Sequence, residues 1–450
     1  MQIFGKFPVA VPQELSYNIS EHFFGKVKRM KTMILTASTG GGHNRASNAL
    51  KSYINTHDPE SDVRIIDAIE ECSSVLNFTV VKGYKALVTL TPSLFGKIYK
   101  NSDKKSPLSD TVTFLYQQCA KRLKPVIDEY MPDVIVSCHP FAGAILGYMK
   151  EQFGYTMPLI SIVTDFLPHR TYIANGINAY VTASAQAKEI LSTEYKIESD
   201  RIFDYGHPIF DRFYEGNGRT REEVLNELGF DPNKRTVLIM AGSFGVTDIL
   251  EIYENLLTID ADYQIIVITG RNQKLYDAFD KLLHDEDEIV TDEEPEFLSW
   301  FGEDSVLRYM YDQSEQVIDI LTRTFRHKIE NRKPTKLFFF IDNVDDYMHA
   351  SDLIVTKPGG LTTSESIAAA LPMVVFKAYP GQEEQNAALL VENNIGVIME
   401  SSETAAQTVG DLLKSDTKLD EMRESCRRFV HKDSCRRIYE LAKNLVENKE

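Results

Sequence analysis

Residues 350–366 read ASDLIVTKPGGLTTSES, and this stretch decides the fold class. Its apolar run at 352–356 predicts a buried strand, and a helix-like segment begins just after Gly359 and Gly360. Two adjacent glycines at such a junction let a ligand approach the backbone, and the free amides at the start of the helix attract an anion. The stretch therefore predicts a diphosphate site. The alternative is an ordinary helix cap that uses Glu365 and the preceding threonines.

Strand-like and helix-like segments alternate along the rest of the chain in the same way. The strand-like runs are continuously apolar, as is typical of parallel strands that helices cover on both faces. They fall at 33–37, 62–67, 133–138, 158–164, 179–183, 201–205, 236–241, 263–269, 336–342, 352–356, 372–378 and 395–399. Helix-like stretches include 43–56, 180–195, 217–228, 364–370 and 383–393. This alternation predicts an α/β protein of two Rossmann-like doubly wound domains that face a cleft.

The predicted elements divide the chain into four parts. These are an N-terminal extension at 1–30, a first Rossmann-like domain at 31–205, a second at 206–425, and a C-terminal helix at 426–450 that could cross back to the first domain. An insert at about 272–335 separates two strands that one helix and a short loop would normally join. Ten acids and no base fall between 285 and 304 in this insert. It forms either a solvated acidic face or an element that binds a partner or gates the site.

The composition of the 450 residues is that of an ordinary globular protein, with 43% apolar and 26% charged residues. The formal charge of −17 argues against a sequence-independent nucleic-acid binder, which needs a basic surface. Five cysteines without a Cys-x-x-Cys pair favour reduced thiols over a disulfide framework or a zinc site. No apolar run reaches the roughly 18 residues of a membrane span, and the first thirty residues hold no signal core. We therefore expect a cytoplasmic protein that can touch a membrane but does not cross one.

A second glycine-rich motif, STGGGH at 38–43, also lies between a strand and a helix. Its glycines expose backbone amides at the helix start, but it matches neither G-x-G-x-x-G nor a P-loop. His43 begins the helix, where an imidazole near the cleft can take a proton from a hydroxyl at neutral pH. His43 is therefore the candidate general base. The alternative is a capping turn with an incidental histidine.

Polar side chains gather in a third motif, YPGQEEQNA at 379–387, after the next predicted strand. Glu384, Gln385 and Asn386 can match the hydroxyls of a sugar one by one. Because this motif and the glycine pair at 359–360 follow neighbouring strands, we expect them to face one ligand. The alternative is a solvent-exposed helix start.

These motifs occur together with several others that carry a family resemblance. The further blocks are SCHPFAGA at 137–144, VTDFLPH at 163–169, GHPI at 206–209, AGSFG at 241–245, TGRN at 269–272 and DNVDDYM at 342–348. Over roughly 31–440 the chain resembles the two-domain glycosyltransferases that include plant monogalactosyldiacylglycerol synthases and bacterial diacylglycerol glucosyltransferases. The peptidoglycan N-acetylglucosaminyltransferase that makes lipid II is similar at a greater distance. The resemblance implies a GT-B fold, with an N-terminal acceptor and membrane-docking domain and a C-terminal UDP-sugar-binding domain.

The resemblance also implies a role for each matching residue. His43 is the general base, and the acceptor side comprises Gly41, Gly42, His139, Asp165 and His169. The nucleotide-sugar side comprises Gly242, Gly245, Phe340, Ile341, Gly359, Gly360, Leu361, Thr362, Glu365, Glu384, Gln385 and Asn386. Within this set, Glu365 binds the ribose hydroxyls, and the backbone at Phe340 and Ile341 binds uracil.

One part of the acceptor side departs from the family. Lipid galactosyl- and glucosyltransferases of this kind usually follow the aspartate segment with a tryptophan and, two residues later, a histidine. Tyr172 and Ala174 stand in those places here. The acceptor is therefore left open.

Residues 76–124 bear on a lipid acceptor because they hold nine bases against two acids, a local charge of +7. Phenylalanine, tyrosine and leucine side chains are interleaved with these bases, a pattern that fits docking on an anionic membrane. The membrane-docking candidates are Lys97, Lys100, Lys104 and Lys105. The alternative is an ordinary pair of charged helices.

The resemblance implies an inverting transfer of a hexose from a UDP-sugar to a lipid hydroxyl, such as that of diacylglycerol, at the inner face of the cell membrane. No Asp-x-Asp-like motif accompanies a phosphate loop, so we expect no essential metal and no cofactor beyond the donor. A UDP-sugar epimerase or hydrolase of the same fold, or a non-catalytic sugar-nucleotide sensor, remains the alternative. Glucose versus galactose, the lipid, the number of sugars added and the oligomeric state are left open by the sequence.

Overall fold

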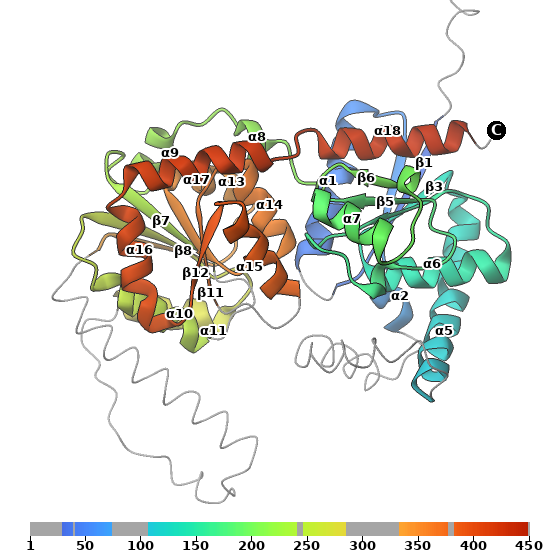
Figure 1. Cartoon of the computed structure of the whole chain (residues 1–450), viewed down its shortest axis with the longest axis horizontal. Coiled ribbons are helices and arrows are strands. Elements are labelled where there is room, and N and C mark those ends of the chain that lie inside the picture. The colour runs from blue at the N-terminus through green and yellow to red at the C-terminus, as the bar shows by residue number, and fades with distance from the viewer. Residues whose placement is uncertain are drawn as a thin grey trace, which may run out of the picture.

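The structure is a computed structural model that describes residues 29–38, 41–73, 107–240, 246–284, 333–376 and 382–448. These residues form two α/β domains that lie next to each other (Figure 1). Each domain has a six-stranded, fully parallel sheet with helices on both faces. This confirms the predicted pair of doubly wound domains.

The N-terminal sheet has the strand order β2-β1-β3-β4-β5-β6. Its strands are β1 (Lys31–Thr36), β2 (Asp62–Asp67), β3 (Val134–Ser137), β4 (Leu159–Ile162), β5 (Ala179–Thr182) and β6 (Ile202–Asp204). The helices are α1 (Gly41–His57), α2 (Ala68–Ser73), α5 (Pro107–Tyr130), α6 (Pro140–Phe153), η1 (Arg170–Tyr172), α7 (Ala185–Thr193) and η2 (Ser199–Arg201). Every residue of β3, β4 and β5 is buried, as continuous apolar runs predict for strands that are covered on both faces.

The C-terminal sheet has the order β12-β11-β10-β7-β8-β9. Its strands are β7 (Arg235–Met240), β8 (Tyr263–Ile268), β9 (Thr335–Phe338), β10 (Leu353–Thr356), β11 (Met373–Phe376) and β12 (Gly396–Met399). The helices are α8 (Arg212–Glu215), α9 (Arg221–Glu227), α10 (Val246–Leu257), α11 (Gln273–His284), α13 (Val344–Ala350), α14 (Gly360–Ala368), α15 (Gln382–Glu392), η4 (Ser402–Thr404), α16 (Ala405–Leu413), α17 (Asp416–Phe429) and α18 (Ser434–Glu447).

All twelve predicted strands are present, but some helix starts were predicted too early. The stretch 180–195 was predicted as helix, whereas β5 occupies 179–182 and α7 starts only at Ala185. The Ser184 side chain caps α7 by accepting from the backbone N–H of Ala187 at 3.0 Å. Similarly, α9 starts at Arg221 rather than at 217, because Thr220 and Glu223 form a reciprocal capping box there.

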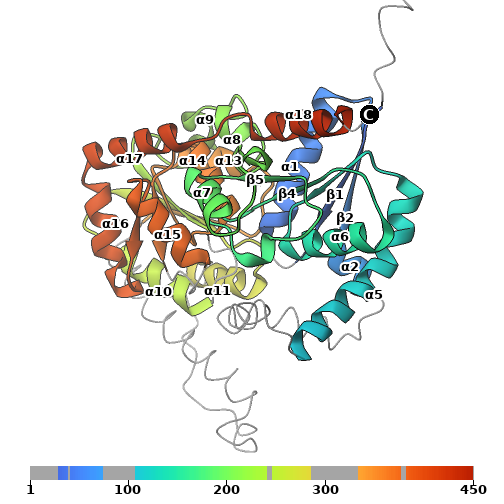
Figure 2. The same cartoon turned by 45° about the vertical axis from the view of Figure 1, so that its right-hand side comes forward.

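Along the described residues the chain passes between the domains twice, and α18 lies on the N-terminal domain. The first crossing follows β6 and the second joins α17 to α18. Figures 1 and 2 show α18 over the N-terminal domain, next to α1. There the Tyr439 hydroxyl donates to the Asp58 carboxylate at 2.7 Å, and Lys443 Nζ lies 3.2 Å from the same group. The N-terminal domain is therefore completed by the C-terminal end of the chain.

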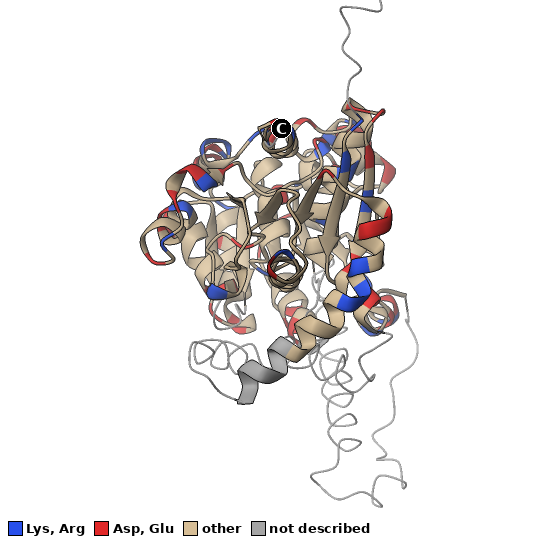
Figure 3. Cartoon of the chain, turned by 90° about the vertical axis from the view of Figure 1, so that its right-hand side faces the viewer, with Lys and Arg blue, Asp and Glu red and all other residues tan. Residues whose placement is uncertain are grey.

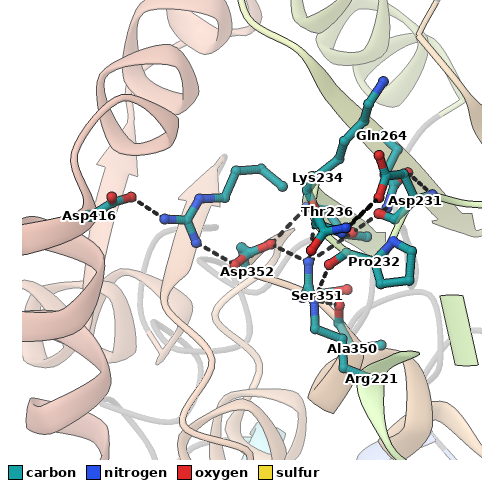
Figure 4. Close-up of polar contacts among 12 residues, drawn as sticks. Arg221, Asp231, Pro232, Lys234, Thr236, Gln264, Ala350, Ser351, Asp352 and Asp416 are labelled. Atoms are coloured by element: carbon teal, nitrogen blue, oxygen red, sulfur yellow. Dashed lines mark hydrogen bonds and ion pairs between the residues drawn. The ribbon is translucent and has the colours of Figure 1, made fainter. Parts of the chain in front are cut away.

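A charged cluster around Asp352 braces the amino ends of the C-terminal strands (Figure 4). The Asp352 carboxylate accepts hydrogen bonds from Arg221 at 2.9 Å and Arg235 at 2.6 Å, from the Thr236 amide at 2.8 Å, and from Arg423 at 3.0 Å. These partners connect α9, β7 and α17 to the start of β10. Because all strands are parallel, this cluster lies at the edge of the sheet opposite to the glycine pair that follows β10. It therefore has a structural role.

No helix in the described part of the chain is long and apolar enough to cross a membrane.

Candidate functional site

The candidate site lies where the carboxyl-end loops of the two sheets meet. On the N-terminal side these are the start of α1, which follows β1, and residues 163–172, which follow β4. On the C-terminal side it is the start of α14, after β10. A Cβ placed on Gly42 of α1 would lie 3.6 Å from the Leu361 side chain, and one on Gly360 would clash with the Thr164 carbonyl oxygen. The two glycine motifs therefore pack against the opposite domain, and glycine is needed at 360 for this close approach.

His43 is the third residue of α1, and its hydrogen bonds fix its tautomer. Its Nδ1 lies 2.9 Å from the Cys138 carbonyl oxygen and 3.0 Å from the Thr164 hydroxyl. Since a carbonyl oxygen only accepts, Nδ1 carries the hydrogen and Nε2 holds the lone pair. Burial lowers the pKa of His43 below its ordinary value of 6.5, although the charge of Asp165 acts in the opposite direction. A neutral imidazole with a basic Nε2 is therefore present at neutral pH.

Three of the predicted acceptor-side residues, His139, Gly41 and Gly42, lie near His43. The His139 ring contacts the His43 ring edge-on at 4.4 Å, and its Nδ1 caps α6 by accepting from the Phe141 amide at 3.0 Å. Burial holds the pKa of His139 well below 6.5. His139 is thus a neutral capping residue beside the candidate base. Gly41 is exposed at the first position of α1 and Gly42 faces Leu361.

Asp165 and His169 lie together in the loop after β4. The Tyr172 hydroxyl donates to Asp165 Oδ2 at 2.8 Å, and His169 Nε2 lies 3.8 Å from the same oxygen. Burial alone would raise the pKa of Asp165, but its hydrogen bonds and the nearby histidines hold the pKa below its ordinary value. Asp165 is therefore a carboxylate, and it provides negative charge close to the candidate base.

On the nucleotide side, Glu365 of α14 is buried and faces the N-terminal domain. Its Oε1 lies 2.7 Å from Arg45 Nη2 of α1, while its Oε2 is buried without a hydrogen-bond partner among the described residues. Burial raises the pKa of Glu365 to about 7, against the opposing charges of Arg45 and Arg212. Gly359 precedes α14, and Gly360, Leu361 and Thr362 form its first turn, so these amides have no carbonyl partner within the helix.

The polar residues of α15 are divided between surface and interior. Glu384 and Gln385 are exposed in the first turn. Asn386 is buried, and its Oδ1 accepts from the Phe166 amide of the other domain at 3.3 Å while its Nδ2 donates to the Pro358 carbonyl at 2.8 Å. In this arrangement Asn386 fastens the N-terminal domain to the loop before α14.

Phe340 and Ile341 lie just after β9, at the outer strand of the C-terminal sheet. The Phe340 side chain is 47% exposed, and the Arg271 guanidinium stacks 4.7 Å from the centre of its ring. An exposed aromatic ring next to a planar cation provides a surface on which a base can stack.

Several residues that shape this site were not singled out from the sequence. Arg45 reaches Glu365, and Thr164 contacts both His43 and Gly360. His207 joins the domains at the first crossing, since its Nε2 donates to the Val163 carbonyl at 3.0 Å and its Nδ1 lies 2.7 Å from the Ser364 hydroxyl. Arg45 follows the glycine-histidine motif by two positions, and His207 lies in the GHPI block. Their places beside or inside these motifs were the only features of the sequence that could have indicated a role at the site.

Some predicted site residues fall outside the described part of the chain. They are Gly242 and Gly245, the membrane-docking candidates Lys97, Lys100, Lys104 and Lys105, and most of the insert at 272–335.

Two family models match the chain, one in each domain. The model described as monogalactosyldiacylglycerol (MGDG) synthase matches residues 43–209, and the glycosyltransferase family 28 C-terminal domain matches residues 312–438. Together the two models show that the chain is a glycosyltransferase. The prediction of a glycosyltransferase enzyme is thereby confirmed.

Curated relatives of this glycosyltransferase are named processive diacylglycerol beta-glucosyltransferases. One such protein of Bacillus cereus is 25% identical over 427 residues, which cover 94% of this chain and 96% of the relative. That of Bacillus cytotoxicus is 24% identical over 401 residues, which cover 89% of each chain.

Solved structures of the same fold include MurG of Acinetobacter baumannii, with a TM-score of 0.54 and 12% identity over 92% of this chain and 99% of MurG. The UDP-GlcNAc 2-epimerase of Neisseria meningitidis, bound to UDP-GlcNAc, has a TM-score of 0.55 and 13% identity over 92% of this chain and 100% of the epimerase. At these identities the likeness shows the fold alone, and it confirms the predicted GT-B arrangement of the glycosyltransferase.

Proposed function

We propose that this glycosyltransferase moves a hexose from a UDP-sugar to the hydroxyl of a lipid such as diacylglycerol, with inversion, at a membrane surface. The observation that carries the proposal is the contact between the two motifs. His43, with a basic Nε2, follows Gly42, which packs on Leu361 in the first turn of α14. A candidate base from one domain and a helix N-terminus from the other, whose amides can bind an anion, therefore lie close together where the two domains meet. Relatives that cover nearly the whole chain are named for glucosyl transfer to diacylglycerol.

The donor fits the C-terminal side of this junction. The first-turn amides of α14 and the positive end of its dipole would neutralise a diphosphate leaving group. Oε2 of Glu365, which has no hydrogen-bond partner among the described residues, can accept a hydrogen bond from a ribose hydroxyl. Phe340 and Arg271 offer a stacking surface for the uracil. Because the first-turn amides and the dipole of α14 would offset the charge of the leaving diphosphate, we propose that the reaction needs no metal ion.

In the transfer step the acceptor hydroxyl gives its proton to His43 Nε2 as its oxygen attacks the anomeric carbon. The new carbon–oxygen bond forms on the face opposite to the breaking bond to the diphosphate, so the configuration inverts and UDP leaves. The hydrogen stays on Nδ1 throughout, bonded to the Cys138 carbonyl oxygen, and this leaves the lone pair on Nε2 before the step.

Entry of the donor requires the two domains to move apart. The Thr164 carbonyl oxygen lies against Gly360. Arg45 pairs with Glu365, and the Phe166 amide donates to the Asn386 side chain. These contacts fill the positions where the diphosphate, the ribose and the sugar would lie. We infer that the described arrangement is the closed, donor-free state, and that the donor replaces these contacts with its own.

The proposed contact with a membrane is supported by residues 114–124, the part of the basic segment 76–124 whose side chains the structure describes. Phe114 of α5 is 58% exposed, and Lys121 and Arg122 are exposed on the same helix. Figure 3 shows Lys and Arg on this helix, which continues at its N-terminal end from the segment that holds Lys97 to Lys105. An exposed aromatic side chain and exposed bases on one helix are typical of a surface that docks on anionic lipid. We propose peripheral association with the inner face of the cell membrane.

A product analysis tests the function and separates it from its rivals. Purified protein is incubated with anionic vesicles that contain diacylglycerol and with labelled UDP-glucose or UDP-galactose, and the products are separated by thin-layer chromatography. We expect label in a lipid fraction, with UDP-glucose as the preferred donor because the relatives are named for glucosyl transfer. Label in an epimerised UDP-sugar or in free hexose would replace the proposal with an epimerase or hydrolase. UDP binding without any turnover would replace it with a sensor.

A further inference from the structure

A continuous line of hydrogen bonds joins His43 to Asp165 through two hydroxyl groups. His43 Nδ1 lies 3.0 Å from Thr164 Oγ1, which lies 2.9 Å from Tyr172 Oη. Tyr172 Oη in turn lies 2.8 Å from Asp165 Oδ2. Tyr172 and Thr164 are both buried, so water does not compete for these bonds.

The donor and acceptor in each link can be assigned from the chemistry of the end groups. A carboxylate only accepts, so the Tyr172 hydroxyl donates to Asp165. The Tyr172 oxygen is then left to accept, so the Thr164 hydroxyl donates to it. The Thr164 oxygen accepts in turn from His43 Nδ1–H, which it shares with the Cys138 carbonyl. All three links therefore point the same way, from the imidazole to the carboxylate.

We propose that Tyr172 and Thr164 are positioning residues that carry the charge of Asp165 to the back of the imidazole of His43. The inference deepens the proposed function, because it rests on His43 as the general base. When Nε2 takes the acceptor's proton, the Nδ1–H becomes a stronger donor, and the aligned hydroxyls transmit the attraction of the carboxylate to it. No proton needs to leave Nδ1 for this to happen.

The inference explains the departure from the family at position 172. A tryptophan side chain has one N–H donor and no acceptor, so it could not accept from the Thr164 hydroxyl. A tyrosine hydroxyl can accept from Thr164 and donate to Asp165 at the same time, as it does here.

Other charged or titratable groups also lie near His43. His139 of α6 contacts its ring, and burial keeps that residue neutral. His169 lies beside Asp165, and Arg45 on the same helix as His43 is paired with Glu365. Asp165 is the acid among these neighbours that raises the pKa of His43. Loss of the relay should therefore lower that pKa.

The test uses Tyr172→Phe, which removes only the hydroxyl, and Thr164→Val, which keeps the shape of the side chain. We expect each to lower kcat about tenfold, the effect of losing one hydrogen bond that serves a charged group. The KM for the UDP-sugar should stay within about twofold, and the acid limb of the pH profile should move to lower pH. The double variant should be no worse than either single variant, since both break the same series of bonds. Tyr180→Phe is the matched control, because the Tyr180 hydroxyl lies on the Ala174 carbonyl at 3.4 Å, outside this line.

A readout that needs no substrate separates this inference from the proposed function. In histidine-labelled protein, nitrogen NMR should show His43 with its hydrogen on Nδ1, and Tyr172→Phe should lower its pKa whereas Tyr180→Phe should not. If the NMR shift appears but wild type makes no glycolipid, the relay stands and the proposed function fails. If wild type makes glycolipid, and Tyr172→Phe and Thr164→Val leave kcat, the pH profile and the His43 pKa unchanged, the relay is wrong. Additive losses in the double variant would also overturn it, because independent effects point to packing.

Discussion

Arg45 Nη2 of the N-terminal domain lies 2.7 Å from Glu365 Oε1 of the C-terminal domain. The Arg45 side chain is 34% exposed and that of Glu365 is 1% exposed, so the carboxylate is buried against its partner. Glu365 is also the residue that family resemblance assigns to the ribose. Two ribose hydroxyls would use both oxygens of this carboxylate, so Arg45 and the donor nucleotide would compete for Oε1.

Glu365→Ala should weaken the binding of UDP by roughly 1.5–3 kcal/mol, the range for a hydrogen bond that involves a charged group. Isothermal titration calorimetry with UDP measures this directly. Equal affinities of variant and wild type would reject the ribose role of Glu365.

Arg45→Met should have the opposite effect and tighten UDP binding about two- to fivefold. The substitution keeps an apolar stem and removes the competing ion pair. The gain is modest because the buried carboxylate also loses a charge that offsets its desolvation. Arg436→Met is the control, since Arg436 pairs with Asp433 and Glu440 on the surface of α18, away from the donor groups. Weaker UDP binding in Arg45→Met would mean that Arg45 contacts the donor itself.

His43→Ala should lower kcat by about 10²- to 10⁴-fold while the affinity for UDP changes little, because the base and the nucleotide groups belong to different domains. In wild type, kcat should fall in acid. Neutral His43 is the active form and its pKa is below 6.5, so activity is retained at neutral pH and lost as the pH drops through that pKa. Unchanged turnover of His43→Ala in the lipid assay would remove it as the base.

Removal of divalent ions should leave the transfer rate within about twofold. The charge of the diphosphate is assigned to the first-turn amides of α14, which chelators do not affect. The lipid assay is run with excess EDTA, and magnesium is then restored in a parallel sample. A large loss that magnesium reverses would show that the leaving group depends on a metal.

Replacement of Lys97, Lys100, Lys104 and Lys105 by Glu should abolish both co-sedimentation with anionic vesicles and lipid glycosylation. The whole chain has a formal charge of −17, so attraction to anionic lipid must come from a local basic surface. For the same reason, binding of wild type should weaken with salt, as the Debye length falls from about 10 Å at 0.1 M to about 3 Å at 1 M. Binding of free UDP should survive. A variant that still sediments with the vesicles would contradict the docking role.

Asp352→Asn should lower the free energy of unfolding by roughly 2–3 kcal/mol, since it leaves three arginines around a neutral side chain. Burial raises the pKa of Asp352, but Arg221, the Thr236 amide and Arg235 outweigh it and hold the pKa below 3.8. The cluster therefore stabilises the fold above the ordinary pKa of an aspartate, and this part of the stability is lost as the pH falls through the lowered pKa.

Urea denaturation at pH 7 and at pH 3 checks this prediction. The difference between wild type and Asp352→Asn should shrink in acid. Asp262→Asn is the control, because Asp262 forms an exposed pair with Lys234 at 2.9 Å, whose attraction the solvent screens. A similar small loss for both variants would show that the cluster adds little.

The sequence predicted the parts of the molecule that depend on local pattern. Apolar runs located all twelve strands, and glycine pairs located the starts of α1 and α14, since buried parallel strands and helix starts have short-range signatures. Helix boundaries were less accurate where a cap decided them, as at Ser184 and Thr220.

Contacts between distant residues could not be predicted in this way. Arg45 and Glu365 are 320 positions apart, and the contact of the Thr164 carbonyl with Gly360 depends on how the domains sit against each other. Tyr172 was noticed as an unusual residue, but its place between Thr164 and Asp165 arises only because η1 folds back over the loop after β4. The roles of the donor residues stay predictions until binding is measured.

The return of α18 to the N-terminal domain affects the order in which the protein can fold during synthesis. The surface of α1 that packs against Ile438, Tyr439 and Leu441 emerges from the ribosome early, whereas α18, which covers it, emerges only after the second domain. The N-terminal domain therefore keeps an exposed apolar surface on α1 until the whole second domain has been translated. A chain that terminates after α17 would contain most of both domains, but the N-terminal domain would lack the helix that covers its apolar surface.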